Sequence, residues 1–302
     1  MGKLILSLLA VFVTIIAGCS SGNEETTPSQ TDGTYVDISA SEAKDLIDDT
    51  PQLVIIDVSP VYDEGHLPGA INHPYGSGAL EAAIPSLNQS VPYLVYCHSD
   101  SVSIAGAKLL VDSEFPTVYR LAGNYAAWVA EDYQIGITAT VDWTADGGIA
   151  SGEYTSSRRL NRNYELYWRM DAENIYIGMR AETDGWVAIG FDPRSRMDEA
   201  DIILGFVSNG QTSIIDSIGT APISSHPEDT DEGGTADIIE FAGSESGEST
   251  IIEFKRLLTT GDAQDKSLSE GPVEIIWAYG SGDNPSQQHS DRGTSEIILG
   301  LQ

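Results

Sequence analysis

The sequence predicts an α/β domain with a mainly parallel sheet, followed by an all-β domain. In the first part of the chain, continuous apolar runs at residues 53–58 and 93–97 alternate with helical patterns. Such runs are typical of strands that are buried on both faces, as in parallel sheets covered by helices. From about residue 137 onward, short β-rich runs recur between clusters of glycine, aspartate and asparagine. Many short strands separated by turn residues are typical of a β-sandwich or a β-barrel.

The first residues have the pattern of an export signal. Lys3 gives a basic start, an apolar run covers residues 4–16, and small residues precede Cys19. This run is too short to span a bilayer comfortably and suits the core of a signal peptide. Residues 16–19 resemble the lipobox of prokaryotic lipoproteins, whose cysteine is lipidated and becomes the new N-terminus. We therefore expect residues 1–19 to be a lipoprotein signal peptide with a lipidated Cys19, which anchors the protein to the cell membrane on its extracytoplasmic face. An uncleaved anchor helix is the alternative.

The segment that follows reads as a tether, and the rest of the chain is strongly acidic. Residues 20–34 are mostly Ser, Thr, Glu and Gly without apolar periodicity, as in a flexible linker. Beyond Cys19, no apolar run is long enough for a second membrane span. The formal net charge is −31, with 46 acidic against 15 basic residues. Such a surface repels the phosphate backbone, so we exclude nucleic-acid binding.

The first domain is expected to cover residues 35–134 and to place a thiol at a strand end. Residues 41–47 open like a capped short helix, and residues 103–111 look helical. Cys97 ends the second buried strand and shortly precedes the second helix. In such a turn, backbone N–H groups point inward and the helix N-terminus adds positive partial charge. A thiol there can become the nucleophilic thiolate; a buried inert cysteine is the alternative.

The residues of this domain resemble the rhodanese family. Residues 57–58, after the first buried strand, match the family's opening, and residues 65–72, Gly-His-Leu-Pro-Gly-Ala-Ile-Asn, match its most recognisable stretch. Residues 121–123 match its closing segment. The resemblance implies a rhodanese-like fold, with Cys97 where the family carries a persulfide during sulfur transfer.

The resemblance makes Cys97, His98 and Asp57 the candidate catalytic residues, with a sulfur-containing small molecule as substrate. His98 lies in the active loop, where it can orient the substrate or tune the thiol. The family commonly has glycine where Asp100 stands and a basic residue where Val102 stands. We expect Asp100 to raise the pKa of the thiol by like-charge repulsion and to repel thiosulfate, while Val102 supplies no cation. Sulfurtransferase activity is therefore expected to be slow, and a sulfur-carrying, sulfide-binding or vestigial role fits equally.

The second domain, residues 137–302, contains a methionine in an unusual setting. Met197 lies in the charged stretch 194–201, although a thioether normally fills apolar gaps. His289 lies in the polar loop 283–293, and a lone loop histidine is more often exposed than a ligand. The β-rich runs cover residues 164–170, 174–181, 185–191, 201–207, 212–218, 250–254, 273–279 and 296–299.

These pieces resemble the DOMON family. Residues 185–191 and 197–205 follow its first signature, and residues 289–293 follow its last. The resemblance implies an immunoglobulin-like sandwich. In the cytochrome branch of the family, a methionine and a histidine at two of these positions bind haem b axially, and Met197 and His289 correspond to them. Met/His ligation fills both axial positions and suits electron transfer. The chain has no Cys-x-x-Cys-His motif, so we expect haem b to bind non-covalently.

The sequence thus predicts an extracytoplasmic, lipid-anchored haem b electron-transfer protein with a rhodanese-like sulfur-handling domain. Its redox partner protein is not identified by the sequence. One alternative is a non-redox ligand-binding or sensor lipoprotein with an inactive rhodanese scaffold. The other is a persulfide-forming sulfurtransferase whose sandwich docks a partner.

Replacing Cys19 with serine is expected to block lipidation, because a hydroxyl cannot take the thioether-linked lipid of a lipobox cysteine. Membrane fractionation should find the Cys19→Ser variant released from membranes or retained as an unprocessed precursor. A variant that still matures, and stays membrane-bound through an unchanged lipid, would show that the assignment is wrong.

Overall fold

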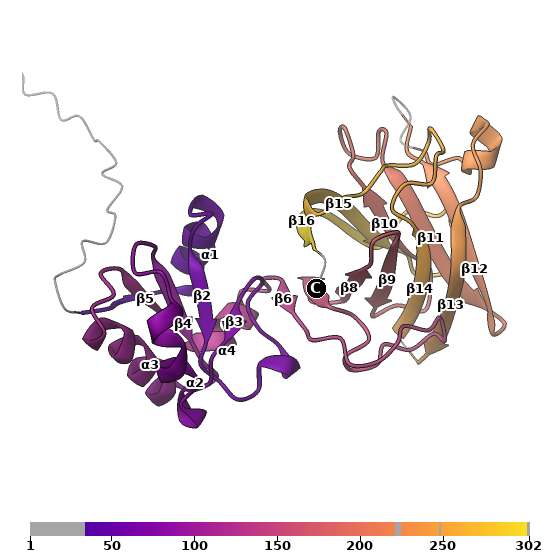
Figure 1. Ribbon diagram of the computed structural model, residues 1–302. Coiled ribbons are helices and arrows are strands. Elements are labelled where there is room, and N and C mark those ends of the chain that lie inside the picture. Colours follow the sequence, from indigo (N-terminus) through magenta and orange to yellow (C-terminus); the bar gives the residue numbers. More distant parts are fainter. Residues whose placement is uncertain (1–33, 221–224, 248, 301–302) are drawn as a thin grey trace, which may run out of the picture.

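The computed structural model of the protein describes residues 34–220, 225–247 and 249–300. Cys19 and the predicted export signal lie outside these residues. Two bodies follow one another along the chain, the first mixed in helices and strands and the second built of strands (Figure 1). None of the described helices is long and apolar enough to cross a membrane.

The first body is a five-stranded parallel sheet with strand order β1-β5-β4-β2-β3. The strands are β1 (Val36–Ile38), β2 (Val54–Asp57), β3 (Ile71–Asn72), β4 (Tyr93–Tyr96) and β5 (Val118–Leu121). The helices are α1 (Ala40–Asp49), α2 (Ala79–Ala83), α3 (Asp100–Asp112) and α4 (Asn124–Ala130), with short 3-10 turns η1 (Tyr62–Glu64), η2 (Tyr75–Ser77) and η3 (Ile84–Ser86). The predicted parallel α/β architecture is confirmed.

Strand β4 lies in the middle of this sheet and is buried at every position. Leu94 and Tyr96 pack on the face that α1 and α4 cover, whereas Tyr93 and Val95 pack on the face that α2 and α3 cover. The continuous apolar run of the sequence reflects this double burial. With both faces closed, the carboxyl end of the strand is the edge where a reactive group can be placed, and Cys97 follows there.

The second body contains two antiparallel sheets, with strand orders β12-β11-β10-β15-β16 and β13-β14-β9-β8-β7-β6. The strands are β6 (Ile135–Gly136), β7 (Ser156–Asn161), β8 (Tyr164–Met170), β9 (Asn174–Ala181), β10 (Val187–Phe191), β11 (Asp201–Ser208), β12 (Gln211–Ile218), β13 (Ile238–Ser246), β14 (Ser249–Leu257), β15 (Gly271–Tyr279) and β16 (Asp291–Leu299), and η4 (Asp229–Glu232) is a 3-10 turn. All predicted β-rich runs are strands. The sequence did not indicate β7, which is largely polar, or β13, which is mostly exposed.

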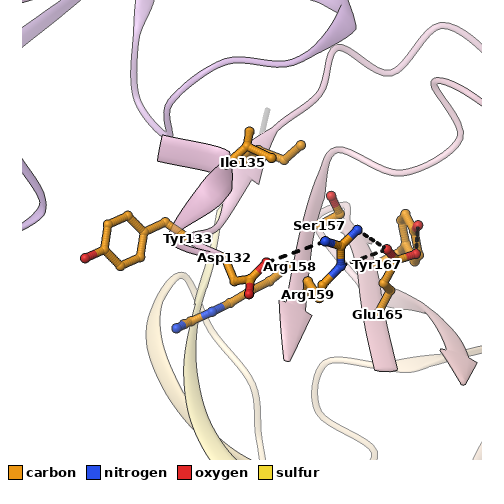
Figure 2. Close-up of a pocket in the computed structure, with 9 residues that line it drawn as sticks. Asp132, Tyr133, Ile135, Ser157, Arg158, Arg159, Glu165 and Tyr167 are labelled. Atoms are coloured by element: carbon orange, nitrogen blue, oxygen red, sulfur yellow. Dashed lines mark hydrogen bonds and ion pairs between the residues drawn. The ribbon is translucent and has the colours of Figure 1, made fainter. Parts of the chain in front are cut away.

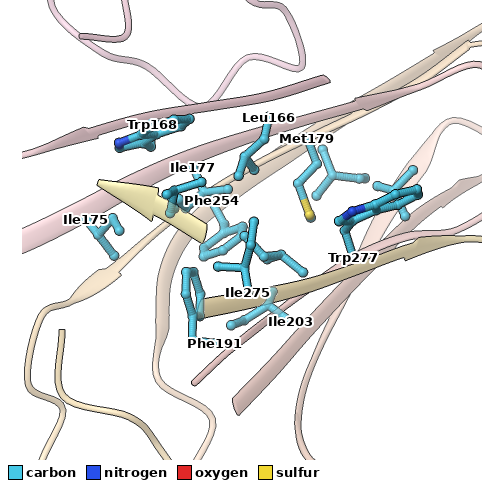
Figure 3. Packing of buried hydrophobic residues seen from close by; sticks show 14 of the residues in the cluster. Leu166, Trp168, Ile175, Ile177, Met179, Phe191, Ile203, Phe254, Ile275 and Trp277 are labelled. Atoms are coloured by element: carbon cyan, nitrogen blue, oxygen red, sulfur yellow. The ribbon is translucent and has the colours of Figure 1, made fainter. Parts of the chain in front are cut away.

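The two sheets enclose one apolar core (Figure 3). Trp168 and Met179 from one sheet face Phe191, Ile203 and Trp277 from the other. The alternation of buried and half-buried residues along β8 shows that this strand has a single core face. Full burial of one large aliphatic or phenylalanine side chain contributes roughly 1.5–3 kcal/mol, so this core holds the sandwich together.

Hydrogen bonds of the backbone and of one side-chain amide join the two bodies. His66 and Gly136 exchange both backbone hydrogen bonds, at 3.0 and 2.9 Å. The side-chain amide of Gln134 pairs with the backbone of Ile298, donating to its carbonyl at 3.1 Å and accepting from its N–H at 2.9 Å. Gln134 thus connects the end of the first body to the last strand of the second.

A small pocket of about 160 Å³ lies beside this junction (Figure 2). Within it, Arg159 lies 3.0 Å from Glu165 and 3.7 Å from Asp132. Arg159 therefore pairs with acidic side chains inside this pocket, and we do not assign a ligand to it.

Candidate functional site

The sheet that contains β10 has an apolar outer face. Along β10, Ile189 and Phe191 pack in the core of the sandwich, so the alternation of the strand turns Ala188 to the opposite face. There Ala188 packs with Trp186 and Leu204 in a separate apolar cluster. Antiparallel sheets usually carry polar side chains on their solvated face. An apolar outer face is therefore suited to being covered by a ligand.

A pocket of about 760 Å³ lies over this outer face. Cofactor and ligand pockets usually measure about 300–1,000 Å³ and are lined mostly by apolar side chains. The floor is contributed by β10, β11 and β15 and includes Ala188, Gly190, Ile202, Leu204, Ile276 and Ala278. A Cβ added at Gly190 would lie 2.8 Å from Ile276 and 3.0 Å from Ile202, so glycine allows these neighbours to close over the strand.

Two loops reach the pocket from opposite ends of the sheet. Strands β10 and β15 are antiparallel, with Val187, the first residue of β10, opposite Tyr279, the last residue of β15. The loop after β10 carries Met197 and the loop after β15 carries His289, so the two loops leave opposite ends. Both Met197 and His289 line the pocket. The structure thus brings together two residues that lie far apart in the sequence.

The loop that carries Met197 is fixed by close packing and by its own ion pairs. A Cβ at Gly219 would lie 1.6 Å from the carbonyl oxygen of Met197, so only glycine lets these segments approach so closely. Arg194 pairs with Asp198 and, at 3.0 Å, with Glu199. Arg194 thus pairs with both acidic residues that follow Met197, and the half-buried Met197 lines the pocket.

The imidazole of His289 is poised as a neutral ligand. Its Nε2 lies 3.0 Å from Nη1 of Arg292, and a guanidinium can only donate, so Nε2 is the acceptor. Partial burial, followed by the charge of Arg292, lowers the pKa of His289. A neutral imidazole with an available nitrogen lone pair is the form that binds metals.

Further polar groups line the pocket beside Met197 and His289. Trp186 is 4% exposed, and its Nε1 has no hydrogen-bond partner among the described residues. Arg196 and Arg292 add two cations to the lining, and His226 adds a second imidazole, whose pKa burial lowers. A lone loop histidine such as His226 carries no sequence signal for this position, because the fold alone brings it to the pocket.

The thiol of the first body lies where the sequence placed it. Cys97 directly follows β4 and is 2% exposed. Its backbone N–H donates to Oδ1 of Asn124 at 3.2 Å. Burial raises the pKa of Cys97, the backbone N–H groups of Ser99 and His98 lower it, and the charge of Asp57 raises it further. The thiol is thus less ready to ionise than the predicted cradle suggested.

The position of Asp100 corrects one expectation. Its Oδ1 accepts hydrogen bonds from Arg120, at 2.7 Å, and from Asn124, at 2.8 Å, and Arg120 lowers the pKa of this carboxyl. Asp100 is therefore held by Arg120 and Asn124 and is not among the charges that raise the pKa of Cys97, so the predicted repulsion of the thiol by Asp100 is wrong. The acid that raises the pKa of Cys97 is Asp57, which is fully buried at the end of β2.

The structure also gives positions for His98 and Val102. His98 is exposed, and its ring stacks on Tyr125 with centroids 4.3 Å apart. Val102 is half-buried in helix α3 and packs against the core cluster on that face. Val102 adds no cation beside the thiol.

Comparison with known proteins identifies both bodies. Residues 39–131 match the model of the rhodanese-like domain, and residues 160–280 match the model of the DOMON domain. The chain therefore carries a rhodanese-like domain followed by a DOMON domain, as predicted.

Several curated proteins are similar to part of the chain. DBH-like monooxygenase protein 1 from Homo sapiens is 34% identical over 163 residues, which cover 52% of this chain and 25% of that protein. The protein of the same name from Mus musculus is 31% identical over 140 residues, covering 45% of this chain and 22% of that protein. The chain thus spans about a quarter of the length of these relatives.

Two solved structures are similar to part of the chain. The Alr3790 protein from Anabaena sp. is 28% identical with a TM-score of 0.31, over 33% of this chain and 81% of that chain. The cytochrome domain of Myriococcum thermophilum cellobiose dehydrogenase is 14% identical with a TM-score of 0.35, over 45% of this chain and 75% of that chain.

Replacing Asp57 with asparagine is expected to lower the pKa of Cys97, because the change removes a negative charge that disfavours the thiolate. Following the ultraviolet absorbance of the thiolate against pH measures this shift. The matched variant Asp100→Asn should leave the pKa of Cys97 unchanged, since the charge of Asp100 is not among those that raise it. A larger shift in Asp100→Asn than in Asp57→Asn would restore the original expectation.

Proposed function

We propose that this chain, a rhodanese-like domain followed by a DOMON domain, is a lipid-anchored electron-transfer protein that binds haem b non-covalently in its outer-face pocket. One observation carries the proposal: Met197 and His289 come from loops at opposite ends of the sheet and line the same pocket. A thioether and a neutral imidazole are the axial ligand pair of electron-transferring haems.

The remaining lining suits a haem as well. The apolar floor would contact the faces and edges of the macrocycle. The exposed guanidinium of Arg196 would receive one of its carboxylates. Arg292 now donates to Nε2 of His289. If that nitrogen binds iron, Arg292 is released to pair with a carboxylate.

When bound, haem b supplies a one-electron carrier whose potential the axial ligands tune. The part of this chain is to hold it. Met197 and His289 would hold the iron from the two loops, and with both bound no site would remain for oxygen or substrate. The ion-paired loop around Met197 restrains this residue, which would limit its movement when the charge of the cofactor changes. The apolar floor would keep water away from the cofactor.

The location and the first domain complete the proposal. The lipobox-like residues 16–19 support anchoring through Cys19 on the extracytoplasmic face of the cell membrane, where a redox partner protein would meet the pocket. Cys97 supports a sulfur-handling role for the rhodanese-like domain. Its burial and raised pKa favour a slow reaction or a scaffold role over rapid sulfur transfer.

Protein produced with adequate haem is expected to show a low-spin b-type spectrum when reduced. Met197→Ala should open one axial position, lower the potential and permit carbon monoxide binding. His289→Ala should weaken haem retention by at least about tenfold, since loss of even an outer-shell partner of a metal site costs about that much. Absorption spectra and haem titrations measure both effects.

The matched control is His226→Ala, which removes the other imidazole of the pocket and should leave the spectrum unchanged. A spectrum that responds to His226→Ala and ignores His289→Ala would refute the assigned ligand. A folded protein that stays colourless after reconstitution would refute haem binding and favour the ligand-sensor alternative.

Thiosulfate:cyanide sulfurtransfer is expected to be slow in the unmodified protein and absent in Cys97→Ser. Val102→Arg should speed it up, because an arginine in the first turn of α3 supplies the anion-binding donor that the loop lacks. The exposed, neighbouring substitution Ser101→Arg serves as control for added charge alone. If no variant has activity while the domain stays folded, the rhodanese-like domain is a scaffold.

A further inference from the structure

A cluster of buried carboxylates lies in the DOMON domain, outside the lining of the haem pocket. Asp201 begins β11, Asp216 lies near the end of β12, and Asp265 lies in the loop between β14 and β15. Their carboxylate groups place oxygens within 4.8 Å of one another. Asp229, the first residue of η4, is also buried, and after burial itself the charges of Asp216, Asp265 and Asp201 raise its pKa.

These carboxylates are buried away from water, and several of their oxygens have no hydrogen-bond partner among the described residues. Asp201 and Asp229 are each 1% exposed, and Asp216 is 7% exposed. Among the residues that the structure describes, Oδ1 of Asp201, Oδ1 of Asp216 and both oxygens of Asp229 and of Asp265 have no hydrogen-bond partner. Buried polar atoms are nearly always hydrogen-bonded. Unpartnered oxygens on all three clustered aspartates, Asp201, Asp216 and Asp265, indicate a ligand that accepts lone pairs.

The charge of the cluster is also unbalanced. Arg256 is completely buried and pairs with Asp201 at 2.8 Å, and its other terminal nitrogen lies 3.7 Å from Asp265. Lys266 is directed instead to Asp192, 3.9 Å away. With all four carboxylates ionised, the one guanidinium would leave three negative charges in an interior where each uncompensated charge is strongly unfavourable. Burial, followed by the charges of the neighbouring aspartates, raises the pKa of Asp229 to about 8, so protons are the competing way to neutralise the cluster.

We propose that Asp201, Asp216, Asp229 and Asp265 bind a calcium ion. Carboxylate oxygens are the ligands of hard divalent cations, whereas softer metals prefer imidazole and thiolate. Calcium accepts irregular sets of about six to eight oxygens. Magnesium demands near-ideal octahedral geometry and keeps several waters, which so buried a cluster does not accommodate. The site is independent of haem.

The ion would add a link between segments that hydrogen bonds already join, since the N–H groups of Lys266 and Asp237 donate to Asp201 at 2.9 Å and to Asp216 at 2.8 Å. It would tie the starts of β11 and η4 to the end of β12 and to the loop after β14. Asp201 directly follows the loop that carries Met197, so calcium would also brace the base of that loop. A ligand that binds only the folded state raises stability with its concentration.

The test uses the full chain, stripped with a chelator and then titrated with calcium chloride. Thermal unfolding should move to higher temperature as calcium increases, and calorimetry should show about one ion per chain. Asp229→Asn, an isosteric change, should reduce the calcium affinity by at least about tenfold. Its chelated form should be as stable as the chelated parent or more stable, because a repelling charge is gone. The control Asp231→Asn alters an exposed aspartate of the same turn and should respond to calcium like the parent.

Three results would overturn the proposal. The first is a folded parent protein that gives neither a calcium-dependent shift nor a heat of binding. The second is an Asp229→Asn variant that responds to calcium like the parent. The third is a response to magnesium chloride that equals or exceeds the response to calcium. If the first result is found and the chelated protein gains stability on acidification, protons neutralise the cluster instead of calcium.

Discussion

Strand β10 has to be apolar on both faces, and the architecture of the second domain follows from this requirement. One face of the strand closes the core of the sandwich through residues such as Ile189 and Phe191, while Ala188 lies on the pocket floor. A sheet with two apolar faces is stable in water only if something covers the second one. The loops that carry Met197 and His289 flank that uncovered face, so the candidate ligand residues lie there and not in the core.

Much of the fold could be predicted because burial leaves a pattern in the sequence. The double burial of β4 produced a continuous apolar run, whereas the polar strand β7 gave no such signal. Met197 and His289 were identified by family resemblance, since spacing alone relates neither residue to the other. The error at Asp100 has a simple cause: its partner Arg120 comes from β5, and the sequence does not reveal where a side chain points. The carboxylate cluster could not be predicted, because nothing in the sequence distinguishes its aspartates from the other acidic residues, 46 in all.

Each domain has a buried arginine that forms ion pairs with aspartates, Arg120 in the first and Arg256 in the second. The two sites differ in how far the negative charge of the aspartates is compensated. Arg120 binds Asp37 with two nitrogens and Asp100 with one, and both aspartates keep about half or more of their side-chain surface exposed, at 50% and 67%. Water therefore shares their charge. Arg256 has no such help, because the carboxylates around it are buried. The chain has few cations. The position of each buried arginine therefore determines whether the aspartates around it are neutralised by the protein and water or, as proposed for those around Arg256, by a bound ion.

The solitary position of Cys97 has a consequence for oxidative chemistry. The chain has two cysteines, and the other, Cys19, belongs to the segment proposed to carry the lipid. A sulfenic acid formed on Cys97 would find no resolving thiol within the described part of the chain, so it could not be stored as an internal disulfide. Recovery would depend on a small external thiol that can enter a nearly closed site. Under sustained peroxide exposure, the same burial that slows the first oxidation would also slow rescue, and the thiol would be lost irreversibly as sulfinic acid.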